Sequence, residues 1–369
     1  MGPSVSEKAL FCTGAGGFIG RYVLSHYLEK EDCDLYLLEH GRFRERLEAF
    51  LDQLAPDPRR SGRVKVFSGD ISQAGLGLDG AIADELKQRV THAIHLAALY
   101  NLSAPRGISV RINVDGTRHV LDFLGKMRSL QRFGHASTIA VAGKHTGIFR
   151  EDDLDLGQGF KNHYDETKFL SERLVRERRS SIPTVILRPT TVVGHSRTGA
   201  IEKIDGPYYA LNMIARSAHR VVPDTGDIRF HFGPVDFIAD AFYHLFEDTE
   251  SVGKVFHLVD PQPLTYLEFF DLACAAMGKP KPAIRLPAPL MRPMGRLPLF
   301  EKLTGVPREA FEHSFYRVEY DTANATPALA RHGISCPPVA SYIGVMVDYY
   351  LKHSDDPRIR RGDWRGVTT

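Results

Sequence analysis

The sequence predicts an α/β fold built on a doubly wound parallel sheet, with a smaller and mostly helical C-terminal part. Three observations indicate it: short apolar runs alternate with helical patterns, a glycine-rich turn joins the first run to the first helix, and the alternation breaks down after residue 194. We expect the sheet domain to span residues 1–200, with a strand and a helix returning at about 230–260. Residues 201–354 would form the smaller part, and residues 355–369 an exposed tail.

Size and composition are those of a globular enzyme. The 369 residues exceed one average domain, and 43% hydrophobic with 25% charged residues excludes a largely disordered or fibrous chain. The 47 basic and 45 acidic residues nearly balance, so no nucleic-acid partner is expected. Four scattered cysteines without C-x-x-C spacing indicate neither a metal site nor a disulfide framework. Without a signal peptide or membrane-spanning run, the chain is expected to be cytoplasmic.

The first predicted strand, Ala9–Thr13, leads into glycines at positions 14, 17 and 20 and then into a helical pattern over Arg21–Lys30. Strand, glycine turn and helix in this order are typical of a Rossmann dinucleotide-binding unit. Gly14 would permit the tight turn, Gly17 the approach of a pyrophosphate, and Gly20 close packing of the helix on the strand. The anion would lie at the helix N-terminus.

The residues near the second strand leave the choice of dinucleotide open. Glu39 ends this strand, where an acid accepts a hydrogen bond from the ribose hydroxyl and so favours NAD. Arg21 follows the glycine turn, and Arg42, Arg44 and Arg46 follow the strand, where they could bind the 2′-phosphate of NADPH or merely solvate a helix face. We expect NAD(P)H, with a slight preference for NADPH.

Three further strands extend the predicted sheet: Asp34–Leu38, Val64–Phe67 and Ala93–Ala98. Asp70 and Ile71 follow the second of these and are expected to frame the adenine. Ala97 and Ala98 end the third, where small side chains let a nucleotide lie close. A helical pattern over Ile82–Arg89 separates the two strands, as in a parallel doubly wound sheet.

The run Tyr164–Lys168 opens a helical pattern over Tyr164–Arg179. Residues four apart share one face of a helix, so the Tyr164 hydroxyl and the Lys168 ammonium can point at the same spot. A neighbouring ammonium lowers the pKa of a phenol towards neutrality, which suits proton exchange with a substrate oxygen. A solvated pair on an amphipathic helix is the alternative, and the glycine turn upstream favours carbonyl/alcohol redox chemistry.

Several segments together resemble the extended short-chain dehydrogenase/reductase family, over residues 9–245. They are Thr13–Gly20, Gly69–Ile71, His95–Ala98, Asn113–Thr117, Ser137-Thr138, Tyr164 with Lys168, and Leu187–Pro189. Within the family, the chain looks most like the branch of thioester reductase domains and fatty acyl-CoA reductases. This likeness rests on Ser137-Thr138 with Val141–Gly143, and on Asn162–Lys168.

The resemblance implies a catalytic set of Thr138, Tyr164 and Lys168. Thr138, after a predicted strand over Phe133–Ser137, would hold the substrate oxygen. Tyr164 would exchange its proton, and Lys168 would lower the pKa of Tyr164 and bind the nicotinamide ribose. Arg188 fits equally well as a structural charge partner and as a residue of the site. The positions expected to bind the cofactor are Gly14, Gly17, Phe18, Ile19, Gly20, Arg21, Glu39, Arg42, Asp70, Ile71, Ala97, Ala98, Asn113, Lys168, Pro189 and Thr190.

The C-terminal half is expected to bind the substrate. Helical patterns cover Asp205–Ala218 and Ile238–Phe246, and Val255–Val259 reads as a strand returning to the sheet. The run Leu286–Phe300 mixes apolar side chains, arginines and four prolines, which exclude one continuous helix. We expect a bent lid over a pocket for a fatty or polycyclic substrate. A peripheral membrane contact and an ordinary cap are the alternatives.

These expectations converge on an NAD(P)-dependent oxidoreductase that moves hydride to or from a carbonyl or alcohol carbon of a large apolar substrate. Reduction of a fatty acyl thioester is the leading example. A hydroxysteroid-type secondary alcohol dehydrogenase using NAD is the first alternative, followed by a nucleotide-sugar epimerase and a non-catalytic nucleotide-binding protein. The resembled family also suggests a homodimer.

Overall fold

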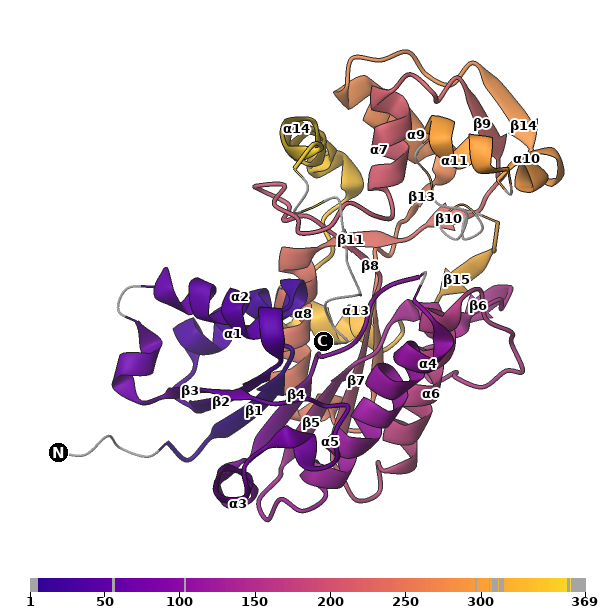
Figure 1. The fold of residues 1–369 in the computed structure, drawn as a ribbon. Helices are drawn as coiled ribbons and strands as arrows, with labels where there is room; N and C mark the ends of the chain where they lie inside the picture. Colours follow the sequence, from indigo (N-terminus) through magenta and orange to yellow (C-terminus); the bar gives the residue numbers. More distant parts are fainter. Residues whose placement is uncertain are drawn as a thin grey trace.

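The computed structural model describes residues 6–54, 57–102, 104–295, 297–304, 306, 311, 315–356 and 359. Most of the tail predicted over residues 355–369 lies outside these residues, as does the side chain of Arg42. Within the described chain, a larger part built on a sheet carries a smaller, mostly helical part above it (Figure 1).

The larger part contains one parallel sheet of seven strands in the order β12-β7-β5-β4-β1-β2-β3. The strands are β1 (Ala9–Thr13), β2 (Asp34–Glu39), β3 (Val64–Ser68), β4 (His92–His95), β5 (Arg132–Ala136), β7 (Thr184–Pro189) and β12 (Val255–Leu258). The predicted return of a late strand is confirmed, because Val255 pairs with Ile186 of β7. The strand order reverses between β1 and β4, and ligands of such sheets bind outside the carboxyl ends of the strands at this point.

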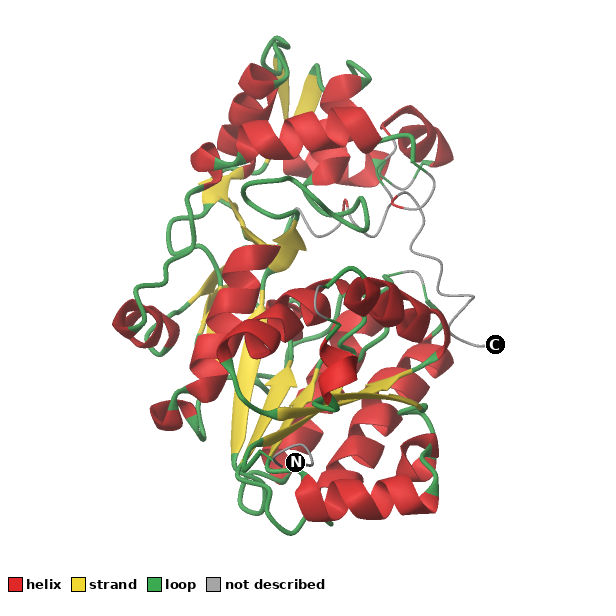
Figure 2. Ribbon diagram, turned by 90° about the vertical axis from the view of Figure 1, so that its left-hand side faces the viewer, coloured by secondary structure: helices red, strands yellow, loops and turns green. Residues whose placement is uncertain are grey.

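Helices cover both faces of this sheet (Figures 1 and 2). One face carries α1 (Phe18–Lys30), α2 (Gly41–Asp52), α8 (Val235–Glu247) and α13 (Ala325–Arg331), and the other carries α3 (Gly80–Arg89), α4 (Arg106–Ser109), α5 (Gly116–Leu124) and α6 (His163–Glu177). Two hydrophobic cores form: Leu24 and Phe242 belong to the first, Leu121 and Val175 to the second. Because the strands are buried on both faces, they read as apolar runs without alternation.

The smaller part has a hydrophobic core of its own, which includes Leu211, Phe269 and Met346. Its helices are α7 (Tyr208–Ala215), α9 (Tyr266–Ala276), α10 (Ala288–Met294), α11 (Pro298–Thr304) and α14 (Ile343–His353). Its two-stranded sheet pairs β9 (Val221–Asp224) with β14 (Ile284–Pro287). Figure 2 shows helices predominating in this part.

Three short strand pairs lie near the junction of the two parts. They are β6 (Gly147–Phe149) with β15 (Val318–Tyr320), β8 (Thr191–Val193) with β11 (Phe232–Pro234), and β10 (Arg229–Phe230) with β13 (Leu264–Thr265). The β11 strand leads directly into α8, which packs on the sheet, while β10 immediately before it pairs within the smaller part. The chain therefore crosses between the parts here.

Two predicted elements are longer than the observed ones. The strand expected over Ala93–Ala98 ends at His95. The amides of Leu96 and Ala97 both donate to the carbonyl oxygen of Thr13, the last residue of β1, and the Ala97 bond is 3.1 Å long. The regular pairing with β1 therefore stops there. The helical pattern over Asp205–Ala218 yields only α7, since Gly206 takes a left-handed conformation (φ 54°) ahead of Pro207.

The proline-rich run is bent, as predicted, and forms α10 and α11 rather than one helix. Met291 is buried, but Leu290, Leu297 and Leu299 are 64%, 56% and 62% exposed. In the described chain, no helix combines the length and the apolar character needed to cross a bilayer.

Candidate active site

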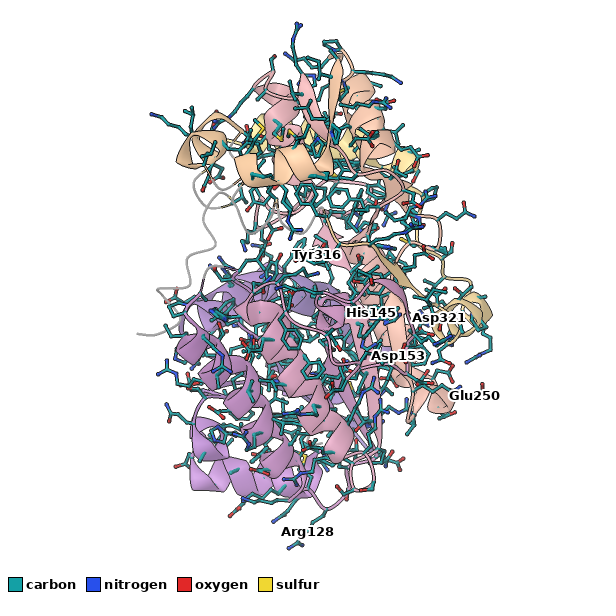
Figure 3. The ribbon with its side chains drawn as sticks, turned by 90° about the vertical axis from the view of Figure 1, so that its right-hand side faces the viewer. Arg128, His145, Asp153, Glu250, Tyr316 and Asp321 are labelled. Carbon is teal, nitrogen blue, oxygen red and sulfur yellow. The ribbon has the colours of Figure 1, made fainter. Side chains whose placement is uncertain are left out.

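A cavity of about 540 Å³ lies at the carboxyl edge of the sheet, where β1 and β4 diverge, and extends to the smaller part. The glycine turn and the ends of β4, β5 and β7 form one wall, and residues 201–210 and 228–231 with several aromatic side chains form the other. Tyr316, one of these aromatics, lies between the two parts, whereas Arg128 lies at the far end of the sheet (Figure 3). The cavity thus occupies the place where the fold predicts a ligand.

The glycine turn is shaped for close approach of a ligand. Gly14 has a left-handed φ of 82°, and a Cβ there would lie 2.8 Å from the Cα of Ala97. A Cβ on Gly20 would lie 2.8 Å from the Cα of Ala15. No side chain caps α1 at Gly17, so the helix N-terminus faces the cavity with its backbone amides, as an anion site requires. These features fit the pyrophosphate of a dinucleotide.

Replacing Gly20 with alanine is expected to weaken NADPH binding by at least about tenfold, because the new Cβ must push the Gly14 turn out of place. Isothermal titration would measure the change. Gly80→Ala is the matched control, since no atom lies within 4 Å of a Cβ at that position. Equal affinities for wild type and Gly20→Ala would contradict this account of the turn.

Glu39 lies at the end of β2, where the sequence predicts that the adenosine ribose would bind. Glu39 lines a smaller cavity of about 230 Å³ together with Asp70. Its Oε1 accepts a hydrogen bond from the Gly16 amide at 2.5 Å. Burial raises the pKa of Glu39 to about 7, against the opposing effects of the Gly16 amide and Arg21. Glu39 therefore braces the glycine turn as well as facing the expected ribose.

Two of the four arginines converge on one carboxylate. Arg21 donates to the Gly16 carbonyl oxygen at 2.6 Å and forms an ion pair with Glu202, which also pairs with Arg46 at 3.5 Å. Arg44 instead pairs with Glu48 on its own helix at 3.5 Å. Arg21 and Arg46 therefore pair with a carboxylate beside the groove, and their binding of a 2′-phosphate stays a prediction.

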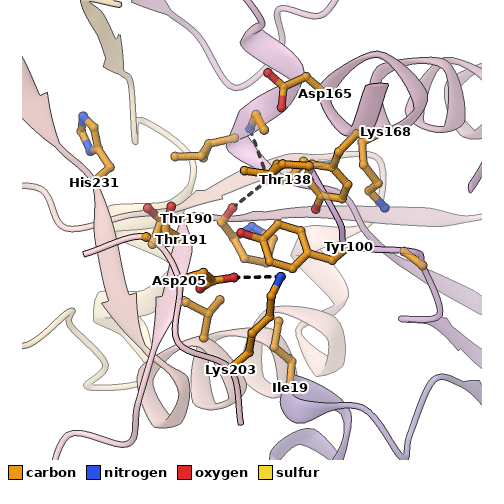
Figure 4. A pocket seen from close by; sticks show the side chains of 18 of the residues that line it. Ile19, Tyr100, Thr138, Asp165, Lys168, Thr190, Thr191, Lys203, Asp205 and His231 are labelled. Atoms are coloured by element: carbon orange, nitrogen blue, oxygen red, sulfur yellow. Dashed lines mark hydrogen bonds and ion pairs between the residues drawn. The ribbon is translucent and has the colours of Figure 1, made fainter. Parts of the chain in front are cut away.

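The three predicted catalytic residues meet at the cavity (Figure 4). Thr138 begins the 3₁₀ turn Ile139–Ala142 after β5, and its hydroxyl oxygen accepts from the Ala140 amide at 3.2 Å. Tyr164 and Lys168 come from the first turns of α6, on the face turned to the cavity. The Tyr164 hydroxyl is hydrogen-bonded to Thr138. One small region thus holds two hydroxyls and an amine.

In this structure burial opposes the predicted effect of Lys168 on Tyr164. Burial raises the pKa of Tyr164 well above its usual value, Thr138 lowers it, and Lys168 is not among the groups that shift it. The Lys168 ammonium instead donates to the Ala136 carbonyl oxygen at 2.7 Å. Burial lowers the pKa of Lys168 to about 8. Tyr164 is therefore held as a protonated phenol.

The end of β7 supplies the wall expected to meet the nicotinamide. Pro189 and Thr190 both line the cavity. Thr190 is only 5% exposed, and its hydroxyl has no hydrogen-bond partner within the described chain. A buried hydroxyl of this kind is costly unless a ligand satisfies it. A carboxamide has both a donor and an acceptor, so the residues present fit a nicotinamide.

Some predicted cofactor residues do not reach the cavities. The side chain of Asn113 makes structural hydrogen bonds. Its Oδ1 accepts from the Leu99 amide at 2.7 Å, and its Nδ2 donates to the Leu99 carbonyl oxygen and to the Thr167 hydroxyl at 3.0 Å. Ile71 packs against the core beneath the sheet, and Ala97, whose backbone lies beside Gly14, lines neither cavity. Among the described residues of 280–303, none lines the large cavity, so the pocket predicted under this run is not formed by it.

The cavity also holds residues that sequence reasoning missed. Tyr100 packs edge-on against Tyr164, with ring centroids 5.0 Å apart. Lys203 lies over the Tyr100 ring at 4.4 Å and pairs with Asp205 at 3.2 Å. In Figure 4, Tyr100 lies between Thr138 and this ion pair. Position after β4 was the available signal for Tyr100, because strand ends face the site. No periodic pattern in the sequence indicated Lys203 and Asp205, which lie in the irregular segment between β8 and α7.

A second charged pair lies on the α6 side of the cavity. Asp165 is fully buried beside Tyr164 and lies 3.7 Å from the Lys161 ammonium. Burial raises the pKa of Asp165 to about 6, and Lys161 lowers it. Tyr266, Tyr316, Tyr320 and His231 add aromatic, hydrogen-bonding walls. The region beside the three residues is therefore more polar than the sequence predicts for a purely apolar substrate.

Comparison with known proteins identifies relatives of this chain. The male sterility protein family, which is NAD-binding, matches residues 12–242. A linear gramicidin synthase protein of Brevibacillus parabrevis is 30% identical over 72% of this chain, which corresponds to 5% of that protein. The fatty acyl-CoA reductase wat of Drosophila melanogaster is 24% identical over 64% of this chain and 53% of its own length. The chain thus spans about half or less of these two curated relatives.

Solved structures of similar fold include relatives of the same kind. The terminal R domain from the myxalamid PKS-NRPS pathway is 26% identical, with a TM-score of 0.78 over 96% of this chain and 92% of that domain. UDP-glucuronic acid 4-epimerase from Bacillus cereus, at 18% identity and a TM-score of 0.64 over 95% of this chain and 99% of the other, shares the fold. The chain therefore belongs to the male sterility protein family and is of the extended short-chain dehydrogenase/reductase type.

Proposed function

We propose that this protein uses NADPH to reduce the carbonyl carbon of an acyl thioester. The observation that carries the proposal is the meeting of Thr138, Tyr164 and Lys168 in one cavity with the glycine turn. Relatives named as a fatty acyl-CoA reductase and as a reductase domain of a peptide synthetase support the thioester class. Cytoplasmic location and a homodimer stay predictions.

The reduced nicotinamide supplies hydride when it is bound. Thr138 and Tyr164 would hold the substrate oxygen by two hydrogen bonds, which fixes the carbonyl carbon near the cofactor. Because burial raises the pKa of Tyr164, its hydroxyl keeps its proton at neutral pH and can give it to the developing oxyanion.

The substrate end supports an acyl group with some polar character. Tyrosine rings offer large apolar area and a hydroxyl at one end. The Lys203–Asp205 and Lys161–Asp165 pairs add donors and acceptors to the cavity that holds Tyr164. We infer that fatty chains with hydrogen-bonding groups, or aminoacyl and peptidyl groups, fit this cavity better than a bare hydrocarbon.

Turnover tests the proposal directly. The purified chain would be incubated with NADPH or NADH and with acyl-CoA thioesters, aldehydes or hydroxysteroids, following nicotinamide absorbance and product by mass spectrometry. We expect thioester-dependent NADPH consumption in which the C–S bond breaks to release free CoA thiol and an aldehyde, or an alcohol after a second hydride transfer. Oxidation of a hydroxysteroid with NAD, without thioester reduction, would overturn the proposal in favour of a secondary alcohol dehydrogenase.

The rate of reduction is expected to fall as pH rises through about 8. Burial lowers the pKa of Lys168 to about 8, so the residue is a cation below that pH and a neutral amine above it. In the proposed mechanism the cation stabilises an oxyanion that forms in the same cavity, and this charge is lost as the proton leaves. A pH profile of kcat/KM would measure this, and a flat profile between pH 7 and 9 would contradict a role for the charge.

A further inference from the structure

The segment between β8 and α7 reaches across the nucleotide groove through Glu202. Its carboxylate forms ion pairs with Arg21 of α1 and with Arg46 of α2, the latter at 3.5 Å. Glu202 and Arg46 line the large cavity together with Gly14 and Gly17 of the glycine turn. A residue of the substrate half thus occupies an anion site that belongs to the dinucleotide half.

The site does not depend on Glu202 for its shape. Arg21 is held by the Gly16 carbonyl oxygen at 2.6 Å, and its side chain is only 17% exposed. Gly16 in turn is bonded to Glu39, the residue at the ribose end of the groove. Because Arg21 and Glu39 both bond Gly16, the two guanidinium groups would lie near the ribose of a dinucleotide bound along the glycine turn.

A phosphate would compete well with the carboxylate. A phosphate monoester carries a charge of about −1.5 to −2 and three acceptor oxygens, against one charge and two oxygens for Glu202. The 2′-hydroxyl of NADH carries no charge, so it does not compete with the Glu202 carboxylate for the two arginines. Binding of NADPH would therefore require Glu202 to leave the arginines, whereas binding of NADH would not.

We propose that Glu202 is a specificity-determining residue: its carboxylate fills the site of the ribose 2′-phosphate, and NADPH binds by displacing it from Arg21 and Arg46. The inference rests on the proposed use of a nicotinamide dinucleotide. Lys203 and Asp205 follow on the same segment and contact Tyr100, which packs on Tyr164.

Binding of two nucleotide fragments tests the proposal without turnover, so it stays informative even if thioester reduction fails. Isothermal titration would compare 2′,5′-ADP with 5′-AMP, which lacks the 2′-phosphate. For Glu202→Gln we expect 2′,5′-ADP to bind about tenfold more tightly and 5′-AMP to be unchanged. Arg46→Gln should weaken 2′,5′-ADP alone.

Asp84→Asn is the matched control, because it removes one negative charge from α3 outside both cavities. Equal tightening of both fragments by Glu202→Gln would overturn the proposal, since the arginines would then serve the 5′-phosphate. No change in either fragment, or the same gain in Asp84→Asn, would also overturn it. Thermal melting of each variant would establish that the fold is retained.

Discussion

Replacing Tyr164 with phenylalanine is expected to lower kcat by about 10²–10⁴-fold, the range that a positioned general acid contributes. The variant loses the only hydroxyl of that side chain, which is hydrogen-bonded to Thr138. The ring and its edge-on contact with Tyr100 remain, so the cavity keeps its shape. Affinity for NADPH, measured by isothermal titration, should not change. Loss of rate with intact binding separates proton transfer from cofactor binding.

Tyr36→Phe is the matched control for removing a phenol oxygen. Tyr36 lies on β2, and its hydroxyl is 3.5 Å from Glu85, away from the large cavity. Its kcat should stay within about twofold of wild type, the scale of substitutions far from a site. If Tyr164→Phe also kept wild-type activity, proton donation would have to come from another group, and the buried Asp165 beside it would be the next candidate.

The sequence predicted the first half of the fold well because its signals are local. A short apolar run, a glycine turn and a helical pattern identify β1 and α1 without knowledge of any other segment. Tyr164 and Lys168 were found in the same way, since four-residue spacing places both on one face of α6. The structure then brings Thr138 to them, 26 positions earlier in the chain, because β5 ends beside α6 at the same sheet edge.

What the sequence did not predict depends on distant contacts. The direction of the pKa shift of Tyr164 follows from burial, which no spacing rule reports. Asn113 was placed near the cofactor, but its amide groups are satisfied by Leu99 and Thr167. Glu202 lies in an irregular stretch without periodicity, and only the folded chain places it beside Arg21. The residues expected to form a lid do not line the large cavity, because α10 packs through Met291 into the hydrophobic core of the smaller part.

The buried ion pair behind the site explains how Thr138 is held. Glu172 of α6 and Arg188 of β7 are both fully buried and pair through two contacts of 2.7 and 2.9 Å. Glu172 also accepts from the Ser137 hydroxyl at 2.6 Å, directly before Thr138. Arg188 donates to the Asp153 carbonyl oxygen at 2.6 Å. This confirms the interpretation of Arg188 as a structural charge partner and ties three segments to the catalytic turn.

Replacing Arg188 with leucine is therefore expected to lower the free energy of unfolding by about 3–5 kcal/mol, because Glu172 is left as a buried carboxylate without its main partner. Urea denaturation would measure the change. Arg178→Leu is the control, since its pair with Asp122 at 3.0 Å is about half exposed and worth less than about 1 kcal/mol. A loss below that of the control would contradict the structural role of Arg188.

The pH dependence of the same variant provides a second test with a defined sign. Burial alone would raise the pKa of Glu172, but Arg188 holds it well below the ordinary value of 4.5. A carboxylate with a depressed pKa contributes stability above its unfolded pKa and loses that contribution as pH falls towards its folded pKa. Without Arg188, burial raises the pKa of Glu172 in the folded variant, so the difference in stability between wild type and Arg188→Leu should begin to shrink above pH 4.5 and go on shrinking below it. A constant difference down to strongly acidic pH would mean that leucine destabilises the protein by packing rather than by leaving a charge unpaired.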